Sequence, residues 1–504
     1  GLSTLFFTEM WERFSYYGMR ALLMLYMVAP LDVGGLGFDV TKAGMIYGMY
    51  TAMVYLLSVP GGWIADRFLG LRRAVFYGGL LIMSGHISLA IPMTGTFYLG
   101  LALVAIGTGL LKPNISALVG RLYTPGDLRR DGGFSIYYMG INLGAFLAPI
   151  VCGTLIAESA SFRQMIADLG FDPNDAWHFA FGAAAVGMAL GLVQYVLSAS
   201  RLGEAGLEPV RPKDRAERTR NHRILAGVLG LVFGIPFVVG VLWYSGVITV
   251  TADGLGEVFM YSLAAIPVIL FTVLFAIPGW TKAERGRLLV VVILFFGAAV
   301  FWSCFEQAGS TLTLFAKQHT DRTIFGWGFG ATLYQSLNSV FVILLAPVFA
   351  WLWVRMARTG KDPTEITKFG IAMLFVGAGF AIMIVPSLTI ADGGKVGWWW
   401  LVMLYLLHTI GEMCLSPVGL SSMTKLAPTR IGGMVMGIWF LGASVGNFMA
   451  GKAAGLTASM THSELFTAMT VFPIGVGVVL LAISRPVRRM LAKNGATEVH
   501  SDVT

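Results

Sequence analysis

Charged side chains are scarce in this sequence. Only 12% of the 504 residues are Asp, Glu, Lys or Arg, whereas a soluble globular protein carries about 25%. Because 56% of the residues are hydrophobic, so little charge cannot keep the chain in water. The composition excludes a soluble enzyme, an antibody-like domain and a disordered scaffold, and it predicts a polytopic membrane protein.

Cysteine is rare as well. Cys152, Cys304 and Cys414 all lie inside apolar runs, so we expect buried, reduced thiols and neither a disulfide, a metal site nor a cofactor. The apolar runs are also much longer than the roughly ten residues of a membrane β-strand, as around residues 290–302. Only helices and closed barrels satisfy their backbone hydrogen bonds in lipid, so we expect an all-α fold.

Apolar runs of about 20 residues, the length that crosses a bilayer, predict fourteen transmembrane helices. They are expected near residues 4–30, 41–65, 74–94, 97–122, 133–157, 177–200, 223–246, 256–279, 288–316, 324–355, 366–390, 397–424, 430–452 and 465–486.

The connections between these helices alternate in basic charge. Of the 35 Lys and Arg residues, 26 fall in one alternating set of connections and six in the other. By the positive-inside rule the rich set is cytoplasmic, and both termini lie with it. This topology accounts for the net charge of +8, so we expect no nucleic-acid partner.

The longest polar stretch, residues 201–223, divides the chain. Six expected helices precede it, two follow closely, and six more complete the chain. This order is similar to the plan of the major facilitator transporters, in which two halves rock about a midplane site. The expected parts are an N-terminal six-helix bundle (1–200), a cytoplasmic linker with an inserted transmembrane hairpin (201–287), a C-terminal six-helix bundle (288–490) and a cytoplasmic tail (491–504).

Seven charged residues lie inside the expected helices and away from the helix ends. Each costs at least about 2.5–3.5 kcal/mol at the centre of a bilayer, and together they would exceed the stability of a fold, about 5–15 kcal/mol. We therefore expect them to face one another or a wet cavity and to mark a functional site. They are Glu9, Glu12, Arg13, Arg20, Lys112, Glu306 and Glu412.

The first expected helix carries four of these charges and two tyrosines on one face. At about 100° per residue, the six side chains fall within an arc of about 140°. Other interpretations remain open: a purely structural ion cluster, aromatic packing for the tyrosines, and snorkelling of long side chains to an interface. The six residues are Glu9, Glu12, Arg13, Tyr16, Tyr17 and Arg20.

The buried charges do not balance. Four acids face three bases, so one carboxylate has no fixed cationic partner. A desolvated carboxylate favours its protonated form and releases the proton when it is wetted or given a cation. The imbalance predicts proton coupling, although it does not say which acid is the odd one.

Several motifs resemble one known family. EMWERFSYYG (residues 9–18) is similar to the ExxERFxYYG signature of the proton-dependent oligopeptide transporters, the POT or PTR branch of the major facilitator superfamily. Further stretches fit the same family in the same order: GGWIADRFLGLRRAVFYGG (61–79), GTGLLKPNISALVG (107–120), FSIYYMGINLGAF (134–146), FWSCFEQAGSTL (301–312), YQSLNSVF (334–341), GEMCLSPVGLS (411–421) and GMVMGIWFLGASVGN (433–447).

The resemblance implies a role for each matching residue. Arg20 and Lys112 would bind a peptide carboxylate, with Tyr17 and Tyr55 nearby. The peptide's amino group would be received by Glu412, Asn142 and Asn338, and its side chains would meet Trp302 and Trp439.

The resemblance also implies how protons are handled. Glu306 would be the proton site, and it would give up Arg20 as its partner when it takes up the proton. The first-helix cluster of Glu9, Glu12 and Arg13 would engage Lys112. Independently of the resemblance, we expect the gates to be the ion pairs Arg20–Glu306 and Lys112–Glu412, the second of which would close the inner side. Two departures are a second helix without histidine and Phe305 in the place of a second acid before Glu306.

The function expected from these residues is proton-coupled import of di- and tripeptides by a monomer in the bacterial inner membrane. A zwitterionic peptide suits the charges, because the first half supplies excess cations and the second half anions. The alternative is a proton-coupled transporter of another small anion or zwitterion, such as nitrate or an amino-acid conjugate. A channel is a further class. An enzyme is not expected, because HExxH and P-loop signatures are missing.

Overall fold

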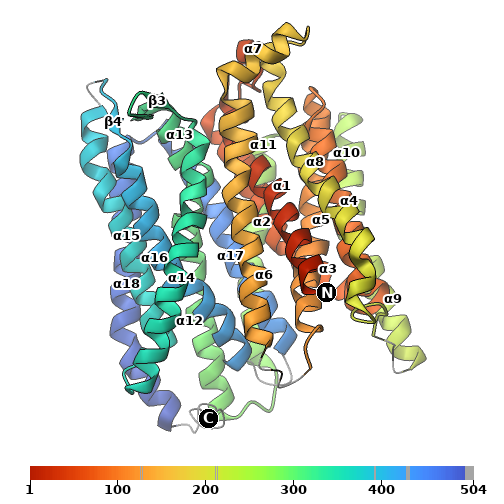
Figure 1. Cartoon of the computed structure of the whole chain (residues 1–504). Coiled ribbons are helices and arrows are strands. Elements are labelled where there is room, and N and C mark those ends of the chain that lie inside the picture. Colours follow the sequence, from red (N-terminus) through yellow and green to blue (C-terminus); the bar gives the residue numbers. More distant parts are fainter. Residues whose placement is uncertain are drawn as a thin grey trace.

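The structure is a computed structural model. It describes residues 1–493 apart from 125, 126, 128, 211, 213, 391, 392 and 427–431. The expected tail therefore lies outside the described residues from 494 onward, as do the first two residues of the helix expected over 430–452. Long helices run roughly parallel through the molecule (Figure 1).

Within the described residues of the first half there are six long helical stretches, several of them built from consecutive pieces. α2, α3 and η2 follow one another directly, and α6 continues into the π-helical segment η3. The elements are α1 (Leu2–Val28), η1 (Leu31–Val33), α2 (Val40–Leu56), α3 (Ser58–Ile64), η2 (Ala65–Leu69), α4 (Leu71–Leu89), α5 (Thr94–Gly120), α6 (Arg130–Ala148), η3 (Pro149–Ala157), α7 (Ala160–Asp168), η4 (Pro173–Asp175), α8 (Ala176–Ser198) and η5 (Ala199–Leu202).

A helical pair then leads into the second half. The pair consists of α9 (Arg215–Leu229), η6 (Gly230–Gly234), α10 (Ile235–Tyr244) and α11 (Ala252–Ala276). The second half comprises α12 (Lys282–Phe305), η7 (Glu306–Gly309), α13 (Thr311–His319), η8 (Ala331–Leu333), α14 (Tyr334–Arg358), α15 (Glu365–Thr389), α16 (Trp399–Leu426), α17 (Gly432–Gly455), η11 (Leu456–Ala458) and α18 (His462–Lys493).

Four two-residue strands lie at one end of the bundle, together with α7 and α13. β1 (Thr320–Asp321) pairs in parallel with β4 (Val396–Gly397), and β2 (Thr323–Ile324) pairs antiparallel with β3 (Trp327–Gly328). We call this end, uppermost in Figure 1, the distal end, and the opposite end, where α18 ends, the terminal end.

Ten helical stretches among the described residues are long and apolar enough to cross a membrane. The predicted helical membrane fold agrees with this, but the predicted count of fourteen is not confirmed. α1 is not among the ten, and its sequence explains why: it carries Glu9, Glu12, Arg13 and Arg20. The side chains that make it unfit for lipid are buried inside the protein instead.

Two predicted helix boundaries are wrong. The helix expected over 324–355 begins only at Ala331, with the 3₁₀ segment η8 that leads directly into α14, because residues 323–328 form the β2–β3 hairpin. The helix expected over 288–316 is interrupted at Glu306–Gly309 by the 3₁₀ segment η7. Apolar composition continues through both regions, so hydropathy alone could not detect the changes of backbone conformation.

Among the described residues, the main seams between the two halves are the contacts of α2 and α3 with α17, of α6 and η3 with α14 and η8, and of α1 with α13 and η7. Small residues allow the closest approach. A Cβ added at Gly48 would lie 2.9 Å from the Phe448 carbonyl oxygen, and one added at Gly451 would meet the backbone of Gly44 and Gly48. Ser444 also donates a hydrogen bond across this seam to the Ala52 carbonyl at 2.8 Å.

Replacing Gly451 with valine tests this seam. The side chain would enter the backbone of α2, and overpacking of this kind costs about 1–3 kcal/mol. We expect Gly451→Val to lower the thermal unfolding midpoint in detergent. Gly475→Val in α18, where nothing lies within 4 Å of an added Cβ, should leave the midpoint unchanged. Equal midpoints for both variants would contradict the seam.

Candidate functional site

The charges of α1 form a buried cluster. Arg13 Nε lies 3.1 Å from Glu9 Oε1 and also pairs with Glu12. All three side chains are buried. One oxygen of each carboxylate and one nitrogen of the guanidinium have no protein partner, so the cluster holds unused capacity for a further polar group.

A second ion pair joins the two halves of the protein. Arg20 Nη2 of α1 lies 2.5 Å from Glu306 Oε2 of η7. The two residues are only 6% and 5% exposed, so snorkelling to an interface does not describe Arg20. Arg20 Nε donates to the Tyr47 hydroxyl at 2.9 Å, and its guanidinium lies over the Tyr17 ring, 5.5 Å from the centroid.

Glu306 occupies this position because a helix ends there. α12 stops at Phe305, η7 turns the chain through Glu306–Gly309, and α13 resumes at Thr311. Irregular backbone at membrane depth is tolerated where it is covered by protein or lines a cavity, and interrupted helices form the binding sites of many transporters.

Lys112 lies on α5 and has a different environment. Its ammonium lies 4.1 Å from the centre of the Tyr55 ring, and Glu12, Glu9 and Glu306 are within electrostatic range of it. An ammonium over an aromatic face is stabilised without a fixed carboxylate partner. Lys112 therefore stays available to an incoming anion.

The second half contributes a carboxylate that lacks a cation in contact. Glu412 Oε2 accepts from Asn338 Nδ2 at 2.8 Å, and the same amide group donates to Thr409 at 3.1 Å. Among the described residues, the ion pairs within 4.0 Å do not include Lys112–Glu412, so that predicted gate pair stays a prediction. On the facing half, Asn142 donates to the Tyr138 carbonyl at 3.0 Å, and the Tyr138 phenol is in electrostatic range of Glu412.

Tyr17 lies among these groups. Its phenol is within electrostatic range of Arg20, Arg13, Glu306 and Glu412. Charges from three separate elements and both halves of the chain thus lie within electrostatic range of one side chain. The structure brings together the buried charges that the sequence singled out.

The two candidate tryptophans lie on the second half. Trp302 contacts Phe301 and Phe305 edge-on, and its Nε1 is buried without a partner. Trp439 is 7% exposed and packs against Phe369. Their predicted role toward a ligand's side chains stays a prediction.

Three residues of this region were missed by the sequence reasoning: Tyr47, Thr409 and Tyr138. Each is an uncharged residue whose hydroxyl or carbonyl contacts one of the marked groups. Mid-membrane charge identified the site, and these residues carry none. Tyr47 could have been suspected only from the tyrosines spaced along its helix.

The arrangement suits a ligand with separated charges. Cationic groups Arg20 and Lys112 come from the first half, and the carboxylates Glu306 and Glu412 from the second. A small zwitterion placed between them would contact both halves at once.

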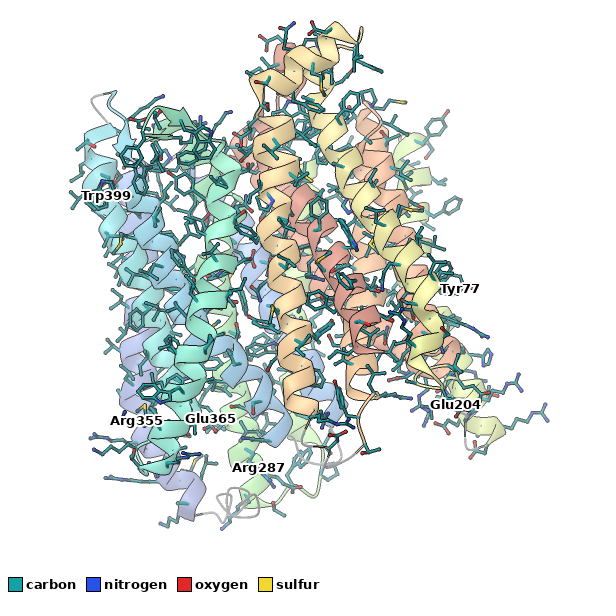
Figure 2. All side chains as sticks on the ribbon, viewed as in Figure 1. Tyr77, Glu204, Arg287, Arg355, Glu365 and Trp399 are labelled. Atoms are coloured by element: carbon teal, nitrogen blue, oxygen red, sulfur yellow. The ribbon has the colours of Figure 1, made fainter. Side chains whose placement is uncertain are left out.

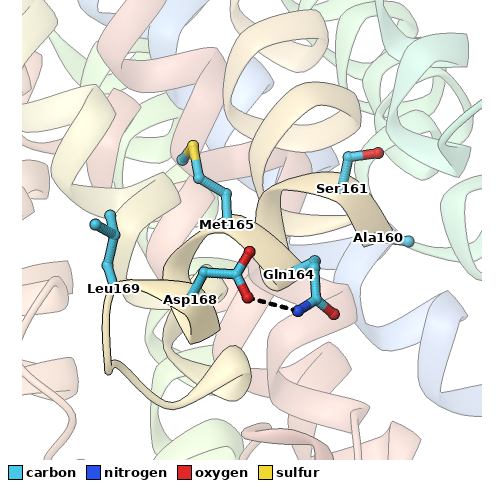
Figure 3. A pocket seen from close by; sticks show the side chains of 6 residues that line it. All are labelled: Ala160, Ser161, Gln164, Met165, Asp168 and Leu169. Atoms are coloured by element: carbon cyan, nitrogen blue, oxygen red, sulfur yellow. Dashed lines mark hydrogen bonds between the residues drawn. The ribbon is translucent and has the colours of Figure 1, made fainter.

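A surface pocket that involves none of these charges lies at the short helix α7 (Figure 3). Its lining residues span 160–169, and the hydrogen bond among them runs from Gln164 Nε2 to Asp168 Oδ1 at 2.8 Å. The pocket is lined by α7 and the residue that follows it and contains none of the buried charges, so it is not the candidate site.

Comparisons with known proteins agree with the motifs. Residues 72–472 match the profile of the POT family. The chain is 39% identical to the peptide transporter YePEPT of Yersinia enterocolitica, over 97% of this chain and 94% of that protein. It is 36% identical to a di-/tripeptide transporter of Lactococcus lactis, over 97% and 96%. The crystal structure of a peptide transporter POT in complex with sulfate superimposes with a TM-score of 0.87, at 41% identity, over 97% of this chain and 95% of that one.

The buried pair Arg20–Glu306 gives a direct stability test. Removing one partner leaves an unpaired buried charge at a cost of about 3–5 kcal/mol, whereas replacing both by apolar groups is often neutral. We expect Arg20→Met and Glu306→Leu each to lower the free energy of unfolding in detergent micelles, and the double variant to recover most of the loss. Replacing either member of the surface pair Arg129–Asp127 should have little effect. If the double variant loses as much free energy of unfolding as the two single variants added together, the two side chains do not form a pair.

Proposed function

The chain belongs to the POT family, as its motifs predicted, and on this premise we propose that it is a proton-coupled symporter that imports di- and tripeptides by alternating access. The observation that carries the proposal is the ion pair between Arg20 and Glu306. This pair connects the two halves of the chain, and both of its members lie beside the other groups expected to bind substrate.

The substrate would lie between the two halves. Its carboxylate would bind Arg20 and Lys112, with the hydroxyls of Tyr17 and Tyr55 beside it. Its amino group would bind Glu412 and would reach two amides on facing helices. These amides are Asn338, which already contacts Glu412, and Asn142. The substrate's side chains would meet Trp302 and Trp439.

The proton would act at Glu306. Protonation removes the charge that holds Arg20, so the guanidinium becomes free to bind the peptide carboxylate. The same neutralisation weakens the closure between the halves at this point. The cluster of Glu9, Glu12 and Arg13 would assist through Lys112, which is in electrostatic range of both acids.

The driving force is sufficient for accumulation. A proton that moves inward gains about 2.3 kcal/mol per 100 mV of membrane potential and about 1.36 kcal/mol per unit of pH. At 100 mV and one pH unit the sum supports roughly 500-fold accumulation for each proton.

The orientation follows from the basic residues. Figure 2 shows Arg287 and Arg355 at the terminal end, and Trp399 at the distal end. By the positive-inside rule we place the terminal end, with both termini, in the cytoplasm. The membrane is the bacterial inner membrane, and the chain acts as a monomer with a six-helix bundle on either side of the inserted hairpin. The pair Lys112–Glu412 would form when the terminal end closes.

Glu306→Gln tests the proton site. In liposomes with an inward proton gradient, we expect this variant to lose accumulation of a labelled dipeptide but to retain exchange of external for internal peptide, because binding survives and coupling does not. The matched control is Glu204→Gln, at an exposed position, which should accumulate peptide like the wild type.

Two outcomes of this assay would contradict the proposal. A Glu306→Gln protein that still concentrates peptide would remove the coupling role of Glu306. If nitrate inhibits wild-type uptake but unlabelled di- and tripeptides do not, the assignment of peptides as the substrate is contradicted.

A further inference from the structure

Glu158 is a buried carboxylate that the proposed transport cycle does not use. It follows the π-helical segment η3 at the distal end of the first half, and its side chain is 3% exposed. It lies at the end of a membrane-spanning stretch rather than within one, so it gave no mid-membrane charge in the sequence.

Within the described part of the chain, the hydrogen-bond and ion-pair partners of its carboxylate all belong to the second half. One carboxylate oxygen accepts from the Thr332 backbone N–H at 3.0 Å and from the Thr332 hydroxyl at 2.8 Å. The other accepts from the Ala331 N–H at 3.1 Å and from the Lys317 ammonium at 3.2 Å, with Arg322 at 3.8 Å. The two N–H groups begin the continuous helical stretch η8–α14, so Glu158 caps the first turn of a helix in the opposite half.

The same seam is polar over several residues. Thr332 Oγ1 also lies 3.3 Å from the Pro149 carbonyl, and Ser336 donates to the Phe146 carbonyl at 2.8 Å. Thr154 and Thr332 hydroxyls are 3.4 Å apart. When a seam of this kind separates, water can replace each of these bonds. The α2–α17 seam is different, because close backbone contact dominates it.

Proton binding does not weaken the Glu158 contacts under mildly acidic conditions. Burial acts to raise the pKa of Glu158, but the Lys317 ammonium and the donors of Thr332 and Ala331 outweigh it and hold the pKa below its ordinary value. Arg322 and Arg163 add positive charge nearby. The carboxylate is therefore ionised at any pH above the ordinary pKa of a glutamate. It becomes protonated only in more acidic solution.

We propose that Glu158 is the latch of the distal gate: a carboxylate of the first half that caps the η8–α14 helix of the second half and must be released each time the distal end opens. The latch rests on the alternating access proposed above, but it acts separately from Glu306. Protonation of Glu306 would release the deep closure at Arg20, whereas the latch would set how readily the distal end then separates.

Distance measurements between the halves test the latch without any substrate. Spin labels at Ser161→Cys in α7 and Thr323→Cys in β2, both exposed positions, report on the distal end by double electron–electron resonance; the three native cysteines are buried. In Glu158→Gln, an NH₂ group replaces one carboxylate oxygen and faces the donors of Lys317, Ala331 or Thr332, which it cannot accept from. We expect it to raise the ratio of open to closed distal ends about tenfold, which corresponds to about 1.4 kcal/mol. Lys317→Ala and Thr332→Val should shift the ratio in the same direction by less.

The matched control is Glu464→Gln. Glu464 also caps a helix at the distal end, but it accepts from Thr461 of its own half at 2.8 and 2.9 Å, so the distances should not change. Unchanged distances in Glu158→Gln, Lys317→Ala and Thr332→Val would overturn the latch, and so would an equal shift in Glu464→Gln. These measurements need no peptide and no proton gradient. The distance results can therefore contradict the latch while the uptake results support the proposed function, and the uptake results can contradict the proposed function while the distance results support the latch.

Discussion

A charge buried in a membrane protein needs a partner, and the ion pair between Arg20 and Glu306 satisfies that need across the boundary between two halves of the chain. Neither residue can leave the other without a substitute, because an unpaired ion at this depth is costly. A substrate carboxylate can replace Glu306 as the partner of Arg20, and a proton can replace Arg20 as the partner of Glu306. Transport coupling follows from this exchange of partners.

The surrounding groups make the exchange selective. Lys112 is held over Tyr55 rather than by a carboxylate in contact, and Glu412 is held by Asn338 rather than by a cation. Lys112 can therefore pair with the carboxylate of a peptide, and Glu412 can pair with its amino group. A simple anion would satisfy Lys112 and Arg20 but would leave Glu412 without a function, which favours a zwitterion over nitrate.

Much of this site could be predicted from the sequence, because a charged residue inside an apolar run is conspicuous. Glu9, Arg13 and Arg20 were found in this way, and helical spacing placed them on one face. The sequence could not show that η7 interrupts a helix at Glu306, since the apolar composition continues on both sides. It could not show Tyr47 or Glu158 either. Tyr47 is recognisable only by its contact with Arg20, and Glu158 only by its contacts with residues more than 150 positions away.

The central claim is that peptide and proton bind together by separating the pair Arg20–Glu306, the peptide carboxylate at Arg20 and the proton at Glu306. Calorimetry of peptide binding tests it most directly. Dipeptide binding to the detergent-solubilised protein, repeated in buffers of different ionisation enthalpy, gives the number of protons taken up. The account predicts an uptake close to one proton for the wild type, because the peptide carboxylate takes Arg20 away from Glu306, and almost none for Glu306→Gln. The same proton uptake in both proteins would contradict it.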